Sequence, residues 1–205
     1  MTKQERKQHW EQIYNDKAFE ACSWYQKTPS FSLKEVQKWT DQQSAIIDIG
    51  AGESRLTSHL FSLGYKDLSV LDISSKAIEK AQANFGDQAN KIRWIHADVT
   101  DFDDSKKYDL WHDRAAFHFL THTNDINTYV DRATESIQPG GYAIIGAFSD
   151  QGPSRCSGIE VQQYTAESMT RCFEKSFELI EQQLQWHITP FETQQAFCFC
   201  TFKKK

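Results

Sequence analysis

The sequence lacks several features that would assign it to common classes of protein. It has no apolar stretch of membrane-spanning length, and its first residues are polar. Its five cysteines are an odd number without the spacing of a disulfide framework. Basic residues number 23 against 28 acidic ones, which gives a net charge of −5. These absences predict a cytoplasmic protein with no membrane partner, and they argue against a nucleic-acid partner.

Two phosphate-binding loops are missing as well. The chain has no Gly-Lys-Ser/Thr sequence, which excludes a triphosphate-binding loop. No third glycine follows Gly50-x-Gly52 up to Leu56, so the Gly-x-Gly-x-x-Gly fingerprint of dinucleotide-binding proteins is incomplete. A NAD-dependent oxidoreductase is therefore disfavoured. His118 and His122 have the i, i+4 spacing of metal ligands, but no third ligand follows at a telling spacing, so we expect no metal.

The most informative feature present is a short apolar run, Ile46-Ile47-Asp48-Ile49, that breaks into Gly50-Ala51-Gly52. Such a run predicts a buried parallel strand that ends in a tight turn, where a ligand can approach the backbone. A second apolar run ends at Asp72, a position from which a carboxylate can hold ribose hydroxyls. Together they predict a cofactor that contains adenosine. Asp48 would repel a pyrophosphate and suit an ammonium group.

This pattern resembles motif I of the class I S-adenosylmethionine (SAM) methyltransferases. Four later segments are similar, in order, to the motifs that follow it: Val70–Ser74, His96–Thr100, Tyr108–Asp113 and Ile137–Tyr142. The resemblance covers residues 44–148. It implies an α/β, Rossmann-like fold with a seven-stranded, mostly parallel sheet, an antiparallel C-terminal strand and helices on both faces. It also implies SAM as the methyl donor and S-adenosylhomocysteine (SAH) as the product.

The resemblance assigns individual residues to the cofactor. Asp72 would hold the ribose, Asp98 the adenine amino group, and Ile73 and Val99 the adenine faces. Glu53 would contact the methionine part of SAM or simply begin a helix, where an acid suits the helix dipole. The expected cofactor residues are Asp48, Gly50, Ala51, Gly52, Glu53, Leu56, Asp72, Ile73, Asp98, Val99 and His112.

The segment from His112 to Thr121 is expected at the strand tip that faces the transferred methyl group. It lacks the Asn/Asp-Pro-Pro-Tyr/Phe sequence of many nitrogen-modifying relatives. It resembles instead a little-characterised branch with Trp-His-Asp-Arg-Ala-x-Phe-His-Phe-Leu, which implies no substrate. Methyl transfer often needs a base, and a histidine has a suitable pKa. The candidate catalytic residues are therefore His112, Asp113, Arg114 and His118.

Two of these residues keep alternative interpretations. His118 is either a base or a capped structural histidine, and Arg114 either binds a substrate carboxylate or closes a structural ion pair. Trp24 and Tyr25 are expected to form a lid over SAM and substrate. Cys156 lies in a Gly/Ser-rich loop, where its thiol would touch a soft substrate or pack beneath a turn. The candidate substrate residues are Trp24, Tyr25, Arg114, His118 and Cys156.

Hydrophobic periodicity and turn signals predict the elements of one domain over residues 1–205. Residues 1–43 form a helical lid, 44–148 the SAM-binding core, and 149–205 a substrate loop with closing strands. Expected helices are 3–19, 30–39 with Ser30 as N-cap, 53–63, 76–85 capped by Ser74 or Ser75, 125–136 and 166–173. Expected strands are 44–49, 68–72, 92–97, 108–112, 142–148, 177–187 and 195–202.

The function that fits these features best is methyl transfer from SAM to a small-molecule acceptor. A protein side chain, such as a lysine, is the alternative acceptor, because a Trp-Tyr lid also resembles some protein-lysine methyltransferases. A SAM-binding module without chemistry is the alternative from a different class. Either a monomer or a dimer is compatible with the sequence.

Overall fold

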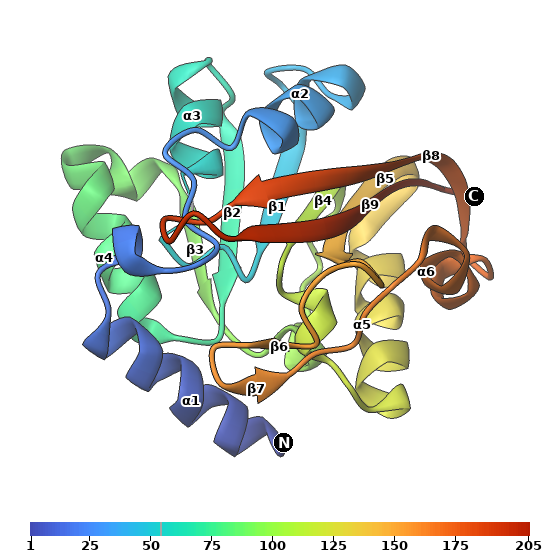
Figure 1. The fold of residues 1–205 in the computed structure, drawn as a ribbon. Coiled ribbons are helices and arrows are strands. Elements are labelled where there is room, and N and C mark those ends of the chain that lie inside the picture. The colour runs from blue at the N-terminus through green and yellow to red at the C-terminus, as the bar shows by residue number, and fades with distance from the viewer. Residues whose placement is uncertain (54) are drawn as a thin grey trace.

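The computed structural model describes residues 1–53 and 55–205, and it builds them around a seven-stranded sheet (Figure 1). The strand order is β3-β2-β1-β4-β5-β9-β8. All strand pairs from β3 to β5 are parallel, whereas β9 runs antiparallel to both β5 and β8. The predicted fold class is confirmed. The strands are β1 (Ala45–Ile49), β2 (Asp67–Asp72), β3 (Arg93–His96), β4 (Tyr108–Arg114), β5 (Ile137–Phe148), β8 (Phe177–Ile188) and β9 (Gln194–Lys204).

Helices cover both faces of the sheet, and side-chain alternation along the strands decides which residues meet which helices. In β1, Ile46 packs toward α2 and α3, and Ile47 and Ile49 pack toward α5 and α6. The α-helices are α1 (Lys3–Asp16), α2 (Ser30–Trp39), α3 (Leu56–Ser62), α4 (Ser75–Phe85), α5 (Thr123–Ser136) and α6 (Ala166–Phe173). Within the two described ranges, no helix is long and apolar enough to cross a membrane.

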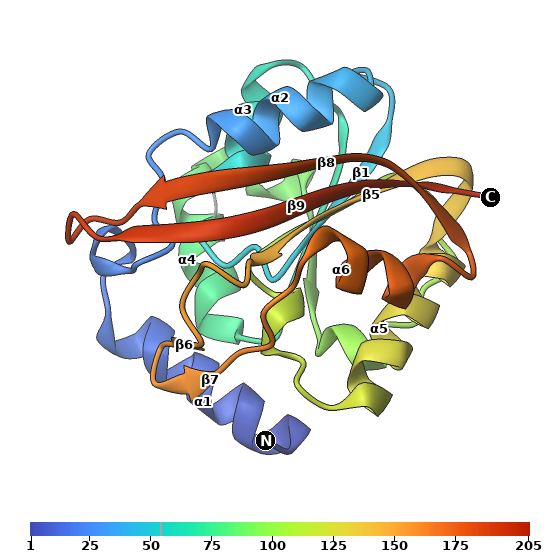
Figure 2. The same cartoon turned by 45° about the vertical axis from the view of Figure 1, so that its right-hand side comes forward.

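The N-terminal helix α1 does not belong to either layer. It lies beside the small hairpin β6–β7 (Arg155–Cys156 and Ile159–Glu160), and the two stay together in both views (Figures 1 and 2). Glu11 of α1 accepts hydrogen bonds from Ser74, Ser75 and Lys76 at the start of α4, with distances of 2.8 to 3.1 Å. These bonds satisfy backbone N–H groups that a helix start leaves without partners. The predicted N-terminal lid is thereby fixed to the sheet edge that carries β2 and β3.

Most predicted elements are present, but several boundaries were wrong. The helix expected at 53–63 spans Leu56–Ser62. Ser54 belongs to that expected helix and to the motif around Gly50, and it lies outside the described residues. Ser30 is the first residue of α2, not its cap: Pro29 is the N-cap, without a side-chain bond. Strand β5 begins at Ile137 rather than at the expected residue 142. Ile137 already pairs with Tyr108 of β4, and the register shifts after this pair. The cap of α4 is Ser74, whose hydroxyl accepts from Ala77 N–H.

Candidate active site

The turn after β1 depends on two glycines. Gly50 and Gly52 both have a left-handed backbone, with φ of 57° and 53°. A Cβ on Gly50 would lie 2.5 Å from the Cβ of Ala116, and one on Gly52 would lie 2.0 Å from the Tyr14 hydroxyl. These separations are too short for any side chain, so the sequence needs glycine here for both conformation and space.

Asp72 holds this turn from the end of β2. One carboxylate oxygen accepts the Gly52 N–H at 2.8 Å, and the other accepts the Ser74 N–H at 2.8 Å. Burial raises the pKa of Asp72 to about 6, although both backbone bonds act to lower it. Each carboxylate oxygen can accept a second hydrogen bond, so two acceptor positions remain beside the cavity. This geometry suits a vicinal diol.

Asp98 differs from Asp72, because its carboxylate is already fully engaged. One oxygen accepts from Arg6 Nε and Nη2 at 3.0 and 2.8 Å, and the other accepts from the backbone and hydroxyl of Thr100. Arg6 also reaches Asp125 at 3.1 Å. An adenine amino group would have to displace one of these donors to contact Asp98. The structure thus uses Asp98 to attach α1 to the sheet.

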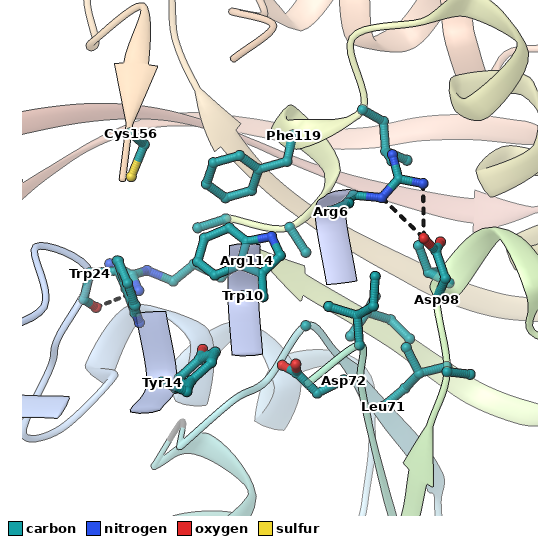
Figure 3. A pocket seen from close by; sticks show the side chains of 18 of the residues that line it. Arg6, Trp10, Tyr14, Trp24, Leu71, Asp72, Asp98, Arg114, Phe119 and Cys156 are labelled. Carbon is teal, nitrogen blue, oxygen red and sulfur yellow. Dashed lines mark hydrogen bonds and ion pairs between the residues drawn. The ribbon is translucent and has the colours of Figure 1, made fainter. Parts of the chain in front are cut away.

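A cavity lies between α1 and the carboxyl ends of the central strands (Figure 3). Asp72, Asp98 and Leu71 stand at one end in Figure 3, and Trp24 and Cys156 stand at the other. Trp10 and Tyr14 of α1 cover the space between the two ends. The full lining is Arg6, Trp10, Tyr14, Trp24, Ile49, Gly50, Leu71, Asp72, Ile73, Ala97, Asp98, Val99, Arg114, Ala115, Ala116, Phe119, Leu120, Phe148, Cys156 and Phe197.

A second, smaller hollow adjoins the cavity and contains His112. Strand register places Asp48 of β1 directly opposite His112 of β4, on the face that α2 covers. His112 Nδ1 lies 2.7 Å from the Asp48 carboxylate, and Nε2 lies 2.9 Å from the Ser32 hydroxyl. We assign the proton to Nδ1, since a carboxylate only accepts; Nε2 then accepts from Ser32. Ala51 and Leu56 also line this hollow, and Trp24, Ile49, Gly50 and Arg114 line both spaces.

Asp113 points to the opposite face of the sheet from His112. Its carboxylate accepts from the Ala116 and Phe117 backbone N–H groups and, at 2.7 Å, from the Tyr129 hydroxyl. Burial raises its pKa to about 6, although these hydrogen bonds act to lower it. Asp113 lines neither hollow. Its contacts stabilise the turn that follows β4, and they give no support to the expected catalytic role.

His118 is completely buried among aromatic rings. Its Nδ1 accepts the Phe148 N–H at 3.1 Å, and its ring stacks on Phe148 with a centroid distance of 4.3 Å. Burial, followed by the nearby charge of Arg114, lowers the pKa of His118 to about 3. The residue lines neither hollow. A neutral, enclosed histidine matches the structural alternative rather than the expected base or substrate contact.

Arg114 ends β4 on the wall between the two hollows. Its Nη1 donates to the Trp24 carbonyl at 3.0 Å, and the guanidinium lies 5.0 Å from the centre of the Phe197 ring. Burial lowers the pKa of Arg114 to about 10, and Asp48 counteracts this effect. The group is therefore still a cation at neutral pH. The structural ion pair expected as one alternative does not occur among the described residues.

The remaining predicted residues divide into two groups. Ile73, Val99, Trp24 and Cys156 line the cavity as expected. Burial raises the pKa of the Cys156 thiol, so the group stays protonated at neutral pH. Tyr25 lines neither hollow and packs edge-on against Phe19, with ring centroids 5.1 Å apart. Glu53 also lies outside both hollows and pairs with Lys80 at 3.5 Å.

Several residues of the site had no recognisable signal in the sequence. Arg6 and Ser32 each lie more than 60 positions from the partners that give them a role, Asp98 and His112. Phe148 and Phe197 were expected only as strand residues, and both line the cavity. Trp10 and Tyr14 of α1 line the cavity too. Only the folded chain brings these distant segments together.

Comparisons with known proteins agree with this architecture. A family model described as a methyltransferase domain matches residues 46–141. A solved structure of 1,6-didemethyltoxoflavin-N1-methyltransferase from Burkholderia thailandensis, with bound 1,6-didemethyltoxoflavin and SAH, covers 100% of this chain. This chain covers 91% of that one, with a TM-score of 0.70 and 17% identity. At that identity the likeness concerns the fold.

Two curated relatives share part of the sequence. The ubiquinone biosynthesis O-methyltransferase of Rickettsia conorii is 24% identical over 119 residues, 58% of this chain and 40% of that protein. The eEF1A lysine and N-terminal methyltransferase of Mus musculus is 27% identical over 93 residues, 45% of this chain and 13% of that protein. The matches thus span less than half the length of these relatives. In its matched domain, its strand order and its glycine turn, the chain is similar to the class I SAM-dependent methyltransferases.

Proposed function

We propose that this protein transfers the methyl group of SAM to a small-molecule acceptor. The observation that carries the proposal is the cavity under α1, which has a cofactor-like end and a second, aromatic end. Helix α1 is attached at two points, through Arg6 to Asp98 and through Glu11 to the start of α4. An acceptor enclosed beneath such a helix is more readily a small molecule than a lysine on a folded protein.

The cofactor end has the parts that SAM requires. The Gly50–Gly52 turn leaves space for close approach, Asp72 keeps two acceptor positions for ribose hydroxyls, and Ile73 and Val99 offer apolar faces to adenine. Product SAH would leave from the same place. The SAH-bound relative of the same fold supports this assignment.

We assign the acceptor's proton to His112 rather than to His118. In the transfer, the acceptor's lone pair forms a bond to the methyl carbon, the C–S bond breaks, and the sulfonium becomes the thioether of SAH. Ser32 passes its hydroxyl proton to His112 Nε2 and receives the proton that the acceptor loses. Asp48 stabilises the resulting imidazolium through Nδ1–H at 2.7 Å.

The experiment that tests the proposal is transfer of radiolabelled methyl from SAM into a cell lysate, followed by ultrafiltration. We expect label in the filtrate, from which mass spectrometry identifies the acceptor. Label retained on protease-sensitive material would overturn the small-molecule acceptor and favour the protein acceptor that the eEF1A-methylating relative suggests. Binding of SAH without transfer to either fraction would favour a SAM-binding module.

A further inference from the structure

Arg114 is a cation of the cavity wall that makes no salt bridge among the described residues, although the charge of Asp48 acts on it. Arg6 is held by Asp98 and Asp125, and Asp98 is held by Arg6. No carboxylate lies within ion-pair distance of Arg114 in the part of the chain that the structure describes. The charge of Arg114 also acts, after burial, to lower the pKa of His118 and of His187. A cation of this kind on a partly enclosed surface calls for an anionic ligand.

The guanidinium also has a hydrogen-bond donor without a partner among the described residues. Its Nη1 is bound to the Trp24 carbonyl at 3.0 Å. Its Nη2 is shielded from solvent and has no hydrogen-bond partner among the described residues. A buried N–H group without a partner is unfavourable, and a charged one more so, because its desolvation is not compensated; its position therefore indicates a missing acceptor. The carbonyl bond and the ring of Phe197 fix the orientation of the guanidinium.

The surroundings of Arg114 are aromatic. Trp24, Phe119, Phe148 and Phe197 line the same part of the cavity. In Figure 3, Arg114 and Trp24 lie on the Cys156 side, away from Asp72 and Asp98. This is the end of the cavity that the adenosine of SAM would leave free. Flat apolar walls around one fixed cation match a planar ring that carries a carboxylate.

We infer that the methyl acceptor is an aromatic carboxylate, and that Arg114 Nη2 binds its carboxylate group. The inference rests on the proposed function and adds the chemical class of the acceptor. The competing source of a carboxylate is SAM itself, whose methionine part carries one. Arg114 also faces the second hollow, so the test must separate the two sources.

The test is calorimetric binding of benzoate and benzamide to the wild-type protein saturated with SAH. The two probes share size and shape but differ in charge. We expect benzoate to bind roughly tenfold or more tightly than benzamide, because a charged hydrogen bond is stronger than a neutral one. Arg114→Met should abolish the preference, and Arg114→Lys should keep part of it. Arg171→Met, on the exposed side of α6, is the matched control and should keep all of it.

A second arm compares SAM with decarboxylated SAM. We expect Arg114→Met to leave the ratio of their affinities unchanged. Equal binding of benzoate and benzamide to wild-type protein, or binding of neither, would overturn the inference even if no variant folds. The inference would also be overturned if wild-type protein binds SAM more tightly than decarboxylated SAM and Arg114→Met loses this difference. Arg114 would then bind the carboxylate of the cofactor. Failure of SAH to bind would instead overturn the proposed function.

Discussion

The two ends of the cavity are built on different principles. At the cofactor end, every carboxylate oxygen has a partner within the protein: Asp72 accepts from backbone N–H groups and keeps two further acceptor positions, and Asp98 accepts from Arg6 and Thr100. At the aromatic end, Arg114 Nη2 is buried without a partner among the described residues. A region whose polar groups have partners within the protein holds its shape without ligand, whereas a buried donor without a partner gains most when a ligand arrives. The comparison indicates a preformed cofactor site beside a selective acceptor site.

The largest expected effect is at the glycine turn. Gly52→Ala should lower SAH affinity about a hundredfold or more, because its Cβ overlaps the Tyr14 hydroxyl and separates α1 from the turn. Gly86→Ala is the matched control: Gly86 has nearly the same φ, 55° against 53°, but no atom within 4 Å of the added Cβ. Calorimetry checks both variants. Equal SAH affinities would show that the turn does not form the cofactor site.

The next effect separates cofactor binding from chemistry. His112→Gln should lower kcat about a hundredfold, since the proton acceptor is lost, and should leave SAH affinity nearly unchanged. His118→Gln should change kcat far less, because His118 lies outside both hollows. Steady-state rates with the identified acceptor provide the measurement. A larger loss for His118 than for His112 would reverse the assignment of the base.

A smaller effect is expected at Asp72. Asp72→Ala should weaken SAH binding by roughly 1–3 kcal/mol, through loss of the ribose hydrogen bonds. Asp87→Ala, an exposed position in the turn after α4, is the control and should have no effect. Calorimetry at neutral pH distinguishes the two. Unchanged affinity in Asp72→Ala would remove Asp72 from the cofactor site.

The smallest effect concerns the pH dependence of stability at His118, which stacks on the cavity residue Phe148. His118 has a folded-state pKa of about 3, below its usual 6.5, so the unfolded chain binds a proton first as pH falls. The wild-type protein should therefore lose about 1.4 kcal/mol of unfolding free energy from this group between neutral pH and pH 5.5. His118→Phe should lack this loss, and exposed His122→Gln should retain it. Urea unfolding at the two pH values measures this loss. An equal change of unfolding free energy with pH in the wild-type protein and in His118→Phe would contradict a buried neutral histidine.

The same contrast explains what the sequence predicted. The cofactor end comes from consecutive strand ends, where each short motif supplies its own backbone, so Gly50, Asp72 and Val99 were predictable as neighbours. The acceptor end combines Trp24, Phe148 and Phe197 from three distant segments. No local pattern encodes that proximity. Likewise, pairing of Asp48 with His112 depends on strand register, which hydrophobic alternation alone does not determine.

Two predictions differ from the structure because a short motif does not encode tertiary contacts or burial. Asp98 was expected to face adenine, but Arg6 of α1 is hydrogen-bonded to its carboxylate. No pattern near Asp98 in the sequence predicts this contact. His118 was expected as a possible base because histidine titrates near neutral pH. Burial against Phe148 removes that property, and burial depends on the tertiary structure.

The central claim is that the cavity beneath α1 is a SAM site, and titration of SAH into the wild-type protein tests it most directly. Calorimetry should show one SAH per chain, and tryptophan fluorescence should change with the same midpoint, because Trp10 and Trp24 line the cavity. NAD should give no signal at the same concentration. Absence of SAH binding, or binding of NAD in its place, would contradict the account.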